Sequence, residues 1–234
     1  MVLKKKRKSK IKDCLVKICG VRDPGIALVA ADAGADFVGL VFVAGSPRRV
    51  TMDEAHAVVN VLPPFVEPIG LFADAPQQTI RQTALTLGLR TCQLHGHETP
   101  VDVRNLAPLR VIKSLVFQDA QTTRPRVEEW RGISNLSAIL FDTPPLGAAL
   151  PGGGGRAFDW KALGLLRDEG TLDGLPPVIL AGGLTPSNVV DAMRAVRPWA
   201  VDVSSGVESS RGIKDPALVA AFCRAAKALE DQSI

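Results

Sequence analysis

The sequence predicts a single-domain α/β fold, a (β/α)8 (TIM) barrel. Short apolar runs alternate with segments of helical periodicity, a pattern typical of parallel strands joined by helical crossovers. The runs are apolar at nearly every position, as in strands that are buried on both faces. Eight such runs occur in 234 residues, close to the roughly 250 residues of this fold. A doubly wound open sheet is the alternative. It would need fewer strands or a more charged edge strand, and no such strand stands out.

Each element follows from its local pattern. The predicted strands are residues 15–19, 37–42, 66–72, 90–95, 110–116, 137–142, 177–181 and 200–204. The predicted helices are residues 24–33, 52–61, 76–87, 101–106, 159–167, 186–196 and 216–229. An eighth helix at 119–130 has the weakest pattern. Asp23-Pro24, Thr51 with Glu54, and Thr185-Pro186 carry the N-cap and first-turn chemistry of helix starts.

The basic character of the chain comes from its first residues. The whole chain has a net charge of +4, and residues 4–12 alone contain seven Lys and Arg, so the rest carries −3. Like-charge blocks of this kind are usually disordered. We therefore expect a disordered basic extension at 1–13 and the barrel at 14–234, with no nucleic-acid partner. A nucleic-acid or membrane-surface arm is the alternative for the extension.

Targeting signals are also weak. No apolar run approaches the ~18 residues of a membrane span, and no apolar core of a signal peptide follows the basic block. The four cysteines, Cys14, Cys19, Cys92 and Cys223, form no C-x-x-C pair. Their spacing indicates neither a disulfide framework nor a zinc site, so we expect reduced thiols and a cytoplasmic location.

Polar residues follow nearly every predicted strand, at the end where barrels of this type carry their active site. Glycine pairs and hydroxyls after the last two strands favour a phosphate site, because backbone N–H groups can approach a phosphate closely there. Ordinary turn chemistry is the alternative. The strand-end residues are Cys19, Arg48, His95, Asp142, Gly182, Gly183, Asp202, Ser204, Ser205 and Gly206.

Cys19 and Asp142 are the candidate proton-transfer groups, on the first and sixth strands. A strand cysteine is more often a small buried hydrophobe, and Asp142 could instead be a loop or N-cap residue. Positive charge lowers the pKa of a thiol, and we expect Arg22 and Arg48 as neighbours of Cys19.

Three other features suggest ligand contacts. Arg48, next to Arg49, could bind a carboxylate through two parallel hydrogen bonds, or could simply lie in a solvated loop. His95 and His97 are too few to form a metal site, so we predict no metal. Residues 143–156 include four successive glycines, which fits either a mobile lid or a surface connection.

Taken together, these motifs resemble the phosphoribosylanthranilate isomerase family of tryptophan biosynthesis. The resemblance runs from about residue 16 to residue 227 and rests on KICG, CQLHG, LFDT, GGGGRAFDW, LAGGLTPSNV and VDVSSGVE, in that order. This chain has GGGGR, ending at Arg156, where many members have GGTGK, and Arg49 replaces a frequent aromatic residue.

The resemblance implies a reaction and a role for each residue. The reaction would be the Amadori rearrangement of N-(5-phospho-β-D-ribosyl)anthranilate, a phosphosugar, without cofactor or metal. Cys19 would be the general base and Asp142 the general acid, with Arg48 at the anthranilate carboxylate. His95 and Asp202 would line the site, and the Gly and Ser pairs would hold the phosphate. We expect a monomer or homodimer. A related phosphosugar isomerase or epimerase is the alternative, but it would favour a first-strand carboxylate or metal ligands.

Overall fold

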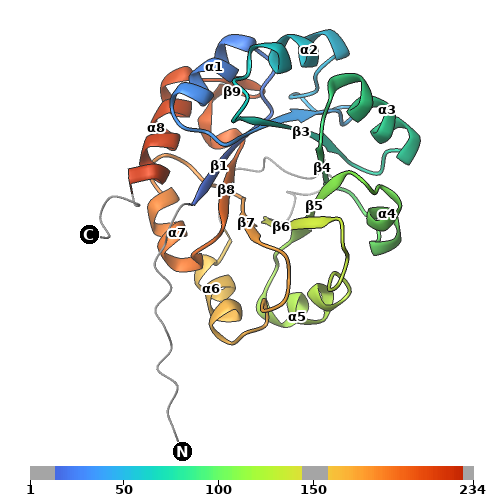
Figure 1. The fold of residues 1–234 in the computed structure, drawn as a ribbon. Coiled ribbons are helices and arrows are strands. Elements are labelled where there is room, and N and C mark those ends of the chain that lie inside the picture. The colour runs from blue at the N-terminus through green and yellow to red at the C-terminus, as the bar shows by residue number, and fades with distance from the viewer. Residues whose placement is uncertain (1–13, 144–157, 229–234) are drawn as a thin grey trace, which may run out of the picture.

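The computed structural model describes residues 14–143 and 158–228 and confirms the predicted barrel. Eight parallel strands close on each other in chain order, and β8 pairs with β1. The helices form a ring around them (Figure 1). The strands are β1 Leu15–Cys19, β2 Phe37–Val41, β3 Glu67–Phe72, β4 Thr91–Leu94, β5 Arg110–Val116, β6 Leu136–Asp142, β7 Val178–Leu180 and β8 Ala200–Val203. The helices are α1 Pro24–Asp32, α2 Met52–Val61, α3 Gln77–Leu87, α4 Pro100–Asn105, α5 Ala120–Glu128, α6 Trp160–Asp168, α7 Val189–Val196 and α8 Pro216–Ala228.

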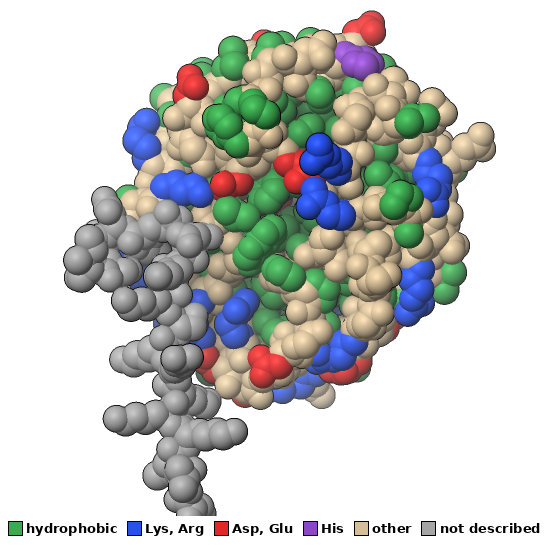
Figure 2. Space-filling view, in the orientation of Figure 1, with side chains coloured by type: hydrophobic (Ala, Val, Ile, Leu, Met, Phe, Trp, Pro, Cys, Tyr) green, Lys and Arg blue, Asp and Glu red, His purple; other side chains and the backbone are tan. Residues whose placement is uncertain are grey.

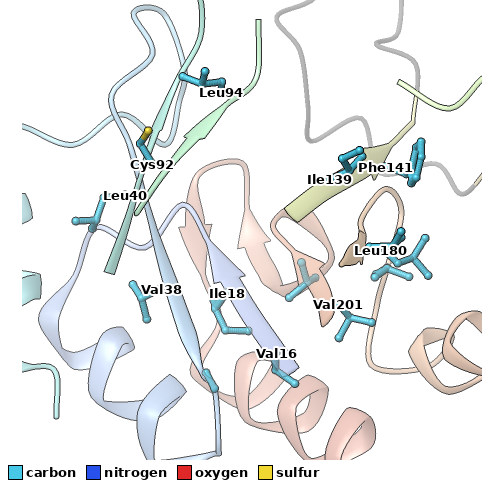
Figure 3. Close-up of a cluster of buried hydrophobic side chains, with 14 of the residues drawn as sticks. Val16, Ile18, Val38, Leu40, Cys92, Leu94, Ile139, Phe141, Leu180 and Val201 are labelled. Atoms are coloured by element: carbon cyan, nitrogen blue, oxygen red, sulfur yellow. The ribbon is translucent and has the colours of Figure 1, made fainter. Parts of the chain in front are cut away.

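The alternation of side chains along each strand divides the core into two parts. The larger cluster lies between the strands and the helices. Figure 3 shows part of it, with Val16 and Ile18 of β1 beside Val38 and Leu40 of β2. A smaller cluster fills the barrel interior and includes Ile69, Ile112, Ala138, Leu140 and Ile179. Side chains that face the barrel interior near the carboxyl ends of the strands lie outside this apolar cluster. Polar residues can therefore occupy those positions.

Local capping explains why most of the helices begin where the sequence predicts. The Asp23 carboxylate accepts a hydrogen bond from the backbone N–H of Ile26, and Thr51 with Glu54 forms a complete capping box. The weakest predicted helix also forms, because Asp119 caps α5 by accepting from the N–H of Thr122.

The predicted start of α7 is wrong by three residues. The helix begins at Val189, and Thr185-Pro186 belongs to the turn before it. The Asn188 side chain stabilises this turn by accepting from the Thr185 N–H at 2.8 Å and donating to the Gly183 carbonyl at 2.9 Å. The Thr-Pro pair thus shapes the loop after β7 rather than the helix.

A small hairpin after β8 was not predicted. Residues Ser205–Val207 form a single 3-10 turn, and β9 (Glu208–Ser210) pairs antiparallel with β10 (Ile213–Lys214). Strands this short carry too little periodicity to be recognised in a sequence. The hairpin brings Glu208 and Lys214 back toward the end of the barrel.

Surface charge is mixed on the face that Figure 2 shows, where basic and acidic side chains are scattered among hydrophobic ones. No helix in the described part of the chain is long and apolar enough to span a membrane. The proposed basic extension at 1–13 lies outside the described residues.

Candidate active site

A cavity lies at the carboxyl ends of the barrel strands. It brings together six of the predicted site residues from five different strand ends, with apolar side chains along one part of its wall. The predicted residues are Cys19, Arg48, His95, Asp142, Asp202 and Ser204, and the apolar ones include Val41, Val43 and Leu71.

Cys19 ends β1 and is almost completely buried. Gly20, with a φ of +78°, lets the chain turn there, and a side chain at this position would lie 2.7 Å from Arg48 Cδ. Burial raises the pKa of the Cys19 thiol, while the charges of Lys17 and Lys214 lower it and that of Asp202 raises it. The expectation that Arg22 lies beside the thiol is wrong, because Arg22 pairs with Glu54 at 3.0 Å on the surface.

Asp142 ends β6 with its carboxyl group buried. Its Oδ1 accepts a hydrogen bond from the Thr143 backbone N–H at 2.7 Å, and its Oδ2 lies 3.5 Å from His95 Nε2. Burial raises the pKa of Asp142 and outweighs the opposing effect of His95. A carboxyl group in this environment favours its protonated form, which is the form that a general acid needs.

His95 connects Asp142 to the end of β4. Burial lowers the pKa of His95, so the neutral ring is favoured. The Gln93 amide nitrogen lies 3.2 Å from His95 Nδ1 and donates to Ser114 Oγ at 3.0 Å. In the tautomer that carries its proton on Nε2, Nδ1 accepts from this amide and the Nε2–H group faces Asp142.

Arg48 is fixed by the hairpin after β8. Its Nε and Nη2 donate to the two carboxylate oxygens of Glu208 at 2.6 and 2.9 Å. Lys214 also donates to Glu208, at 2.8 Å, and to the Ser204 carbonyl at 2.9 Å. One edge of the guanidinium, formed by Nε and Nη2, is thus occupied by Glu208. The other edge, formed by Nη1 and the second N–H of Nη2, is left for a ligand carboxylate.

A second, smaller cavity adjoins the first and shares Asp142, Asp202 and Ser204 with it. It collects every residue of the predicted phosphate set: Gly182, Gly183, Ser204, Ser205 and Gly206. Gly182 has a φ of +81°, and a side chain there would lie within 3.0 Å of Thr143 and Asp142 Oδ1.

Two further predictions concern a metal site and a lid. Within residues 14–143 and 158–228, no group of three His, Cys, Asp or Glu side chains is arranged to hold a metal. His97 points away from the site and pairs with Asp74 at 3.0 Å. The glycine run of the predicted 143–156 lid lies outside the described residues, apart from Thr143.

Among the residues of this region that were missed in the sequence are Lys17, Gln93, Glu208 and Lys214. Lys17 and Gln93 did carry a signal. Each is a long polar side chain at a barrel-facing position of an otherwise apolar strand, where burial is costly without a partner. Glu208 and Lys214 lie in the unpredicted hairpin. Glu208 ends the VDVSSGVE motif but was given no role, and Lys214 carried no comparable signal.

Comparisons with known proteins point to one family. The family described as "N-(5'phosphoribosyl)anthranilate (PRA) isomerase" matches residues 16–225. The N-(5'-phosphoribosyl)anthranilate isomerase of Paramagnetospirillum magneticum is 44% identical over 216 residues, which cover 91% of this chain and 96% of that protein. The enzyme of the same name from Pseudomonas putida is 42% identical over 212 residues, or 90% and 96% of the two chains.

Solved structures give the same result. Phosphoribosyl anthranilate isomerase from Thermotoga maritima superposes with a TM-score of 0.81 at 35% identity, over 92% of this chain and 99% of that one. A phosphoribosyl anthranilate isomerase in complex with reduced 1-(o-carboxyphenylamino)-1-deoxyribulose 5-phosphate has a TM-score of 0.78 at 34% identity, with the same coverage.

Proposed function

The chain belongs to the N-(5'-phosphoribosyl)anthranilate isomerase family, and we propose that Cys19 and Asp142 carry out its reaction. The protein is an isomerase of tryptophan biosynthesis. Its substrate is N-(5-phospho-β-D-ribosyl)anthranilate, and its product is 1-(2-carboxyphenylamino)-1-deoxy-D-ribulose 5-phosphate.

The observation that carries the assignment of residues is the pair of joined cavities. The larger has an apolar wall and Arg48, which suits an aromatic ring bearing a carboxylate. The smaller is formed by glycines and serines, which suits a phosphate. Asp142 borders both, so a ribose spanning the two cavities would pass between Asp142 and Cys19.

The reaction then divides into two proton transfers. Protonated Asp142 gives its proton to the ribose ring oxygen, and the ring opens to an iminium ion. The Cys19 thiolate removes the proton from C2, which gives an enolamine that tautomerises to the ketone. The iminium is an electron sink within the substrate, so the proposed route uses neither cofactor nor metal. One group must start protonated and the other ionised, the arrangement of a matched acid and base.

The activity itself can be tested directly. Purified protein is expected to consume phosphoribosylanthranilate, followed as loss of its fluorescence. If Cys19 and Asp142 were intact and the substrate were not consumed, the proposed function would be wrong.

Gly182→Ala is expected to lower kcat by up to about 10²-fold, because a side chain there displaces Thr143 and the Asp142 carboxyl group. Gly88→Ala is the matched control. Gly88 also has a positive φ, +66°, but a side chain there meets nothing within 4 Å. Both variants should lose stability through backbone strain, measured by thermal unfolding, and only the first should lose turnover. Equal turnover in the two variants would contradict this role for Gly182.

Deleting residues 1–12 is expected to leave kcat/KM unchanged, because every described residue that lines the two cavities lies beyond them. The fluorescence assay on the shortened and full chains measures this. A collapse in rate would refute our proposal that 1–13 is an accessory extension to a barrel at 14–234.

Location and assembly remain proposals. All four cysteines lie among the described residues and none is disulfide-bonded, which supports a cytoplasmic location. A related Thermotoga maritima isomerase is described as dimeric, with monomers generated from it. We propose a monomer or homodimer, which light scattering coupled to size exclusion would distinguish.

A further inference from the structure

Lys17 is a buried charge that the proposed reaction does not yet use. It lies on β1 two residues before Cys19, so the two side chains face the same side of the strand, toward the barrel interior. Its side chain has no exposed surface, and its Nζ donates to Asp202 Oδ1 at 2.9 Å. Burying an ammonium group is costly, and an apolar residue would fill this interior position at lower cost.

The Lys17 ammonium and the Cys19 thiol are neighbours above Gly39 of β2. Gly39 pairs with Cys19 across the two strands. A Cβ atom built on Gly39 would lie 3.0 Å from both Cys19 Sγ and Lys17 Nζ. The absence of a side chain at Gly39 therefore leaves the space in which the two groups meet.

The charges in this cluster act in opposite directions. Burial alone lowers the pKa of Lys17, but the negative charges of Asp202 and of ionised Cys19 raise it above its ordinary value. Burial raises the pKa of the Cys19 thiol, and Lys17 opposes this more strongly than any other group. The Lys17 ammonium thus stays charged and acts on the thiol.

We infer that Lys17 is the positioning residue that allows Cys19 to act as a base: its ammonium group, held in place by Asp202, stabilises the buried thiolate. The inference rests on the proposed role of Cys19. Asp202 then has two opposing effects on the Cys19 thiolate: its carboxylate holds Lys17 in place, and its negative charge repels the thiolate.

Other charged groups border the thiol and would remain unchanged in the test. Lys214 is partly neutralised by Glu208, at 2.8 Å, and Arg48 is paired with the same carboxylate. Asp142 and His95 lie on another part of the cavity wall and pair with each other. Lys17, by contrast, is paired with Asp202. A substitution of Asp202 therefore leaves the Arg48–Glu208–Lys214 contacts in place.

The experiment measures the pKa of Cys19 from the pH dependence of its alkylation by iodoacetamide, read at Cys19 by peptide mass spectrometry. In Lys17→Met the thiol pKa is expected to rise by about 1–3 units, the usual effect of losing an opposite charge at this range. In Asp202→Asn, which keeps a hydrogen-bond acceptor for Lys17, the thiol pKa is expected to fall. A merely structural role would not produce shifts of opposite sign.

Lys113→Met is the matched control. Lys113 is also buried and paired, with Glu98 at 2.7 Å on the β4–β5 side, but it is not among the groups acting on Cys19. The Lys113→Met variant should leave the pKa of the Cys19 thiol unchanged. Circular dichroism and thermal unfolding check that each variant folds.

An unchanged thiol pKa in folded Lys17→Met, or shifts of the same sign in Lys17→Met and Asp202→Asn, would overturn the inference. Failure of the proposed role of Cys19 would give a different result. The Cys19→Ala variant would then keep its turnover, and this result does not depend on the pKa measured by alkylation.

Discussion

Replacing Cys19 by alanine is expected to lower kcat by about 10²–10⁴-fold, the range that a general base contributes. The thiol borders the cavity, and its neighbours Lys17 and Asp202 remain paired with each other without it. The fold should therefore persist. Steady-state kinetics with the fluorescence assay, together with thermal unfolding, measure the two effects separately.

Cys92→Ala is the control for this prediction. Cys92 lies on β4 but faces the helices, and burial raises the pKa of its thiol to about 12, so it stays protonated. Its loss should cost stability through a cavity in the core and leave kcat unchanged. If Cys19→Ala kept its kcat, or if Cys92→Ala lost it, Cys19 would not be the base.

The contrast between these thiols shows what the sequence could and could not predict. Strand ends were predictable from apolar runs, and the position of Cys19 at a strand end followed directly. The charges around it were predictable only in part. The prediction chose Arg22 and Arg48 and missed Lys17, which lies two residues before Cys19 on the same face of β1. Asp202, which holds Lys17, was not predictable as its partner, because β8 pairs with β1 only through closure of the barrel.

Barrel closure is a long-range event, and local patterns carry no information about its register. Lys17 and Asp202 are 185 residues apart in sequence and directly opposite in the β1–β8 pairing. The same limit applies to Glu208, whose contact with Arg48 joins segments 160 residues apart. Helix caps are local and were mostly predicted well. The exception is α7, where the Asn188 side chain stabilises a turn that resembles a helix start.

Replacing Asp142 by asparagine is expected to lower kcat by about 10²–10⁴-fold without loss of stability. Asparagine keeps the shape of the side chain and an oxygen that accepts from the Thr143 N–H, but it has no proton to give. The pKa of Asp142 is raised by burial, so the folded chain binds this proton more tightly than the unfolded chain does. The free energy of unfolding therefore falls as pH rises from the ordinary aspartate pKa of about 3.9 through the raised value.

The asparagine side chain in Asp142→Asn carries no charge to bury at high pH. The free energy of unfolding of the variant, minus that of the wild type, should therefore be larger at pH 8 than at pH 4. Thermal unfolding at the two pH values measures this. A relative loss at pH 8 would mean that the carboxylate is stabilised in the fold and is not poised as an acid.

The pH dependence of turnover gives the last test of the pair. The active form needs an ionised thiol and a protonated carboxyl group, so wild-type kcat/KM should rise with pH, level off and then fall. Whichever of the two groups has the higher pKa, the fall at high pH requires that both titrate. In Asp142→Asn only the thiol remains, so the residual rate should rise with pH and level off without falling. A high-pH decline that survives in the variant would place the acid elsewhere, and the neighbouring His95, 3.5 Å away, would be the first residue to test.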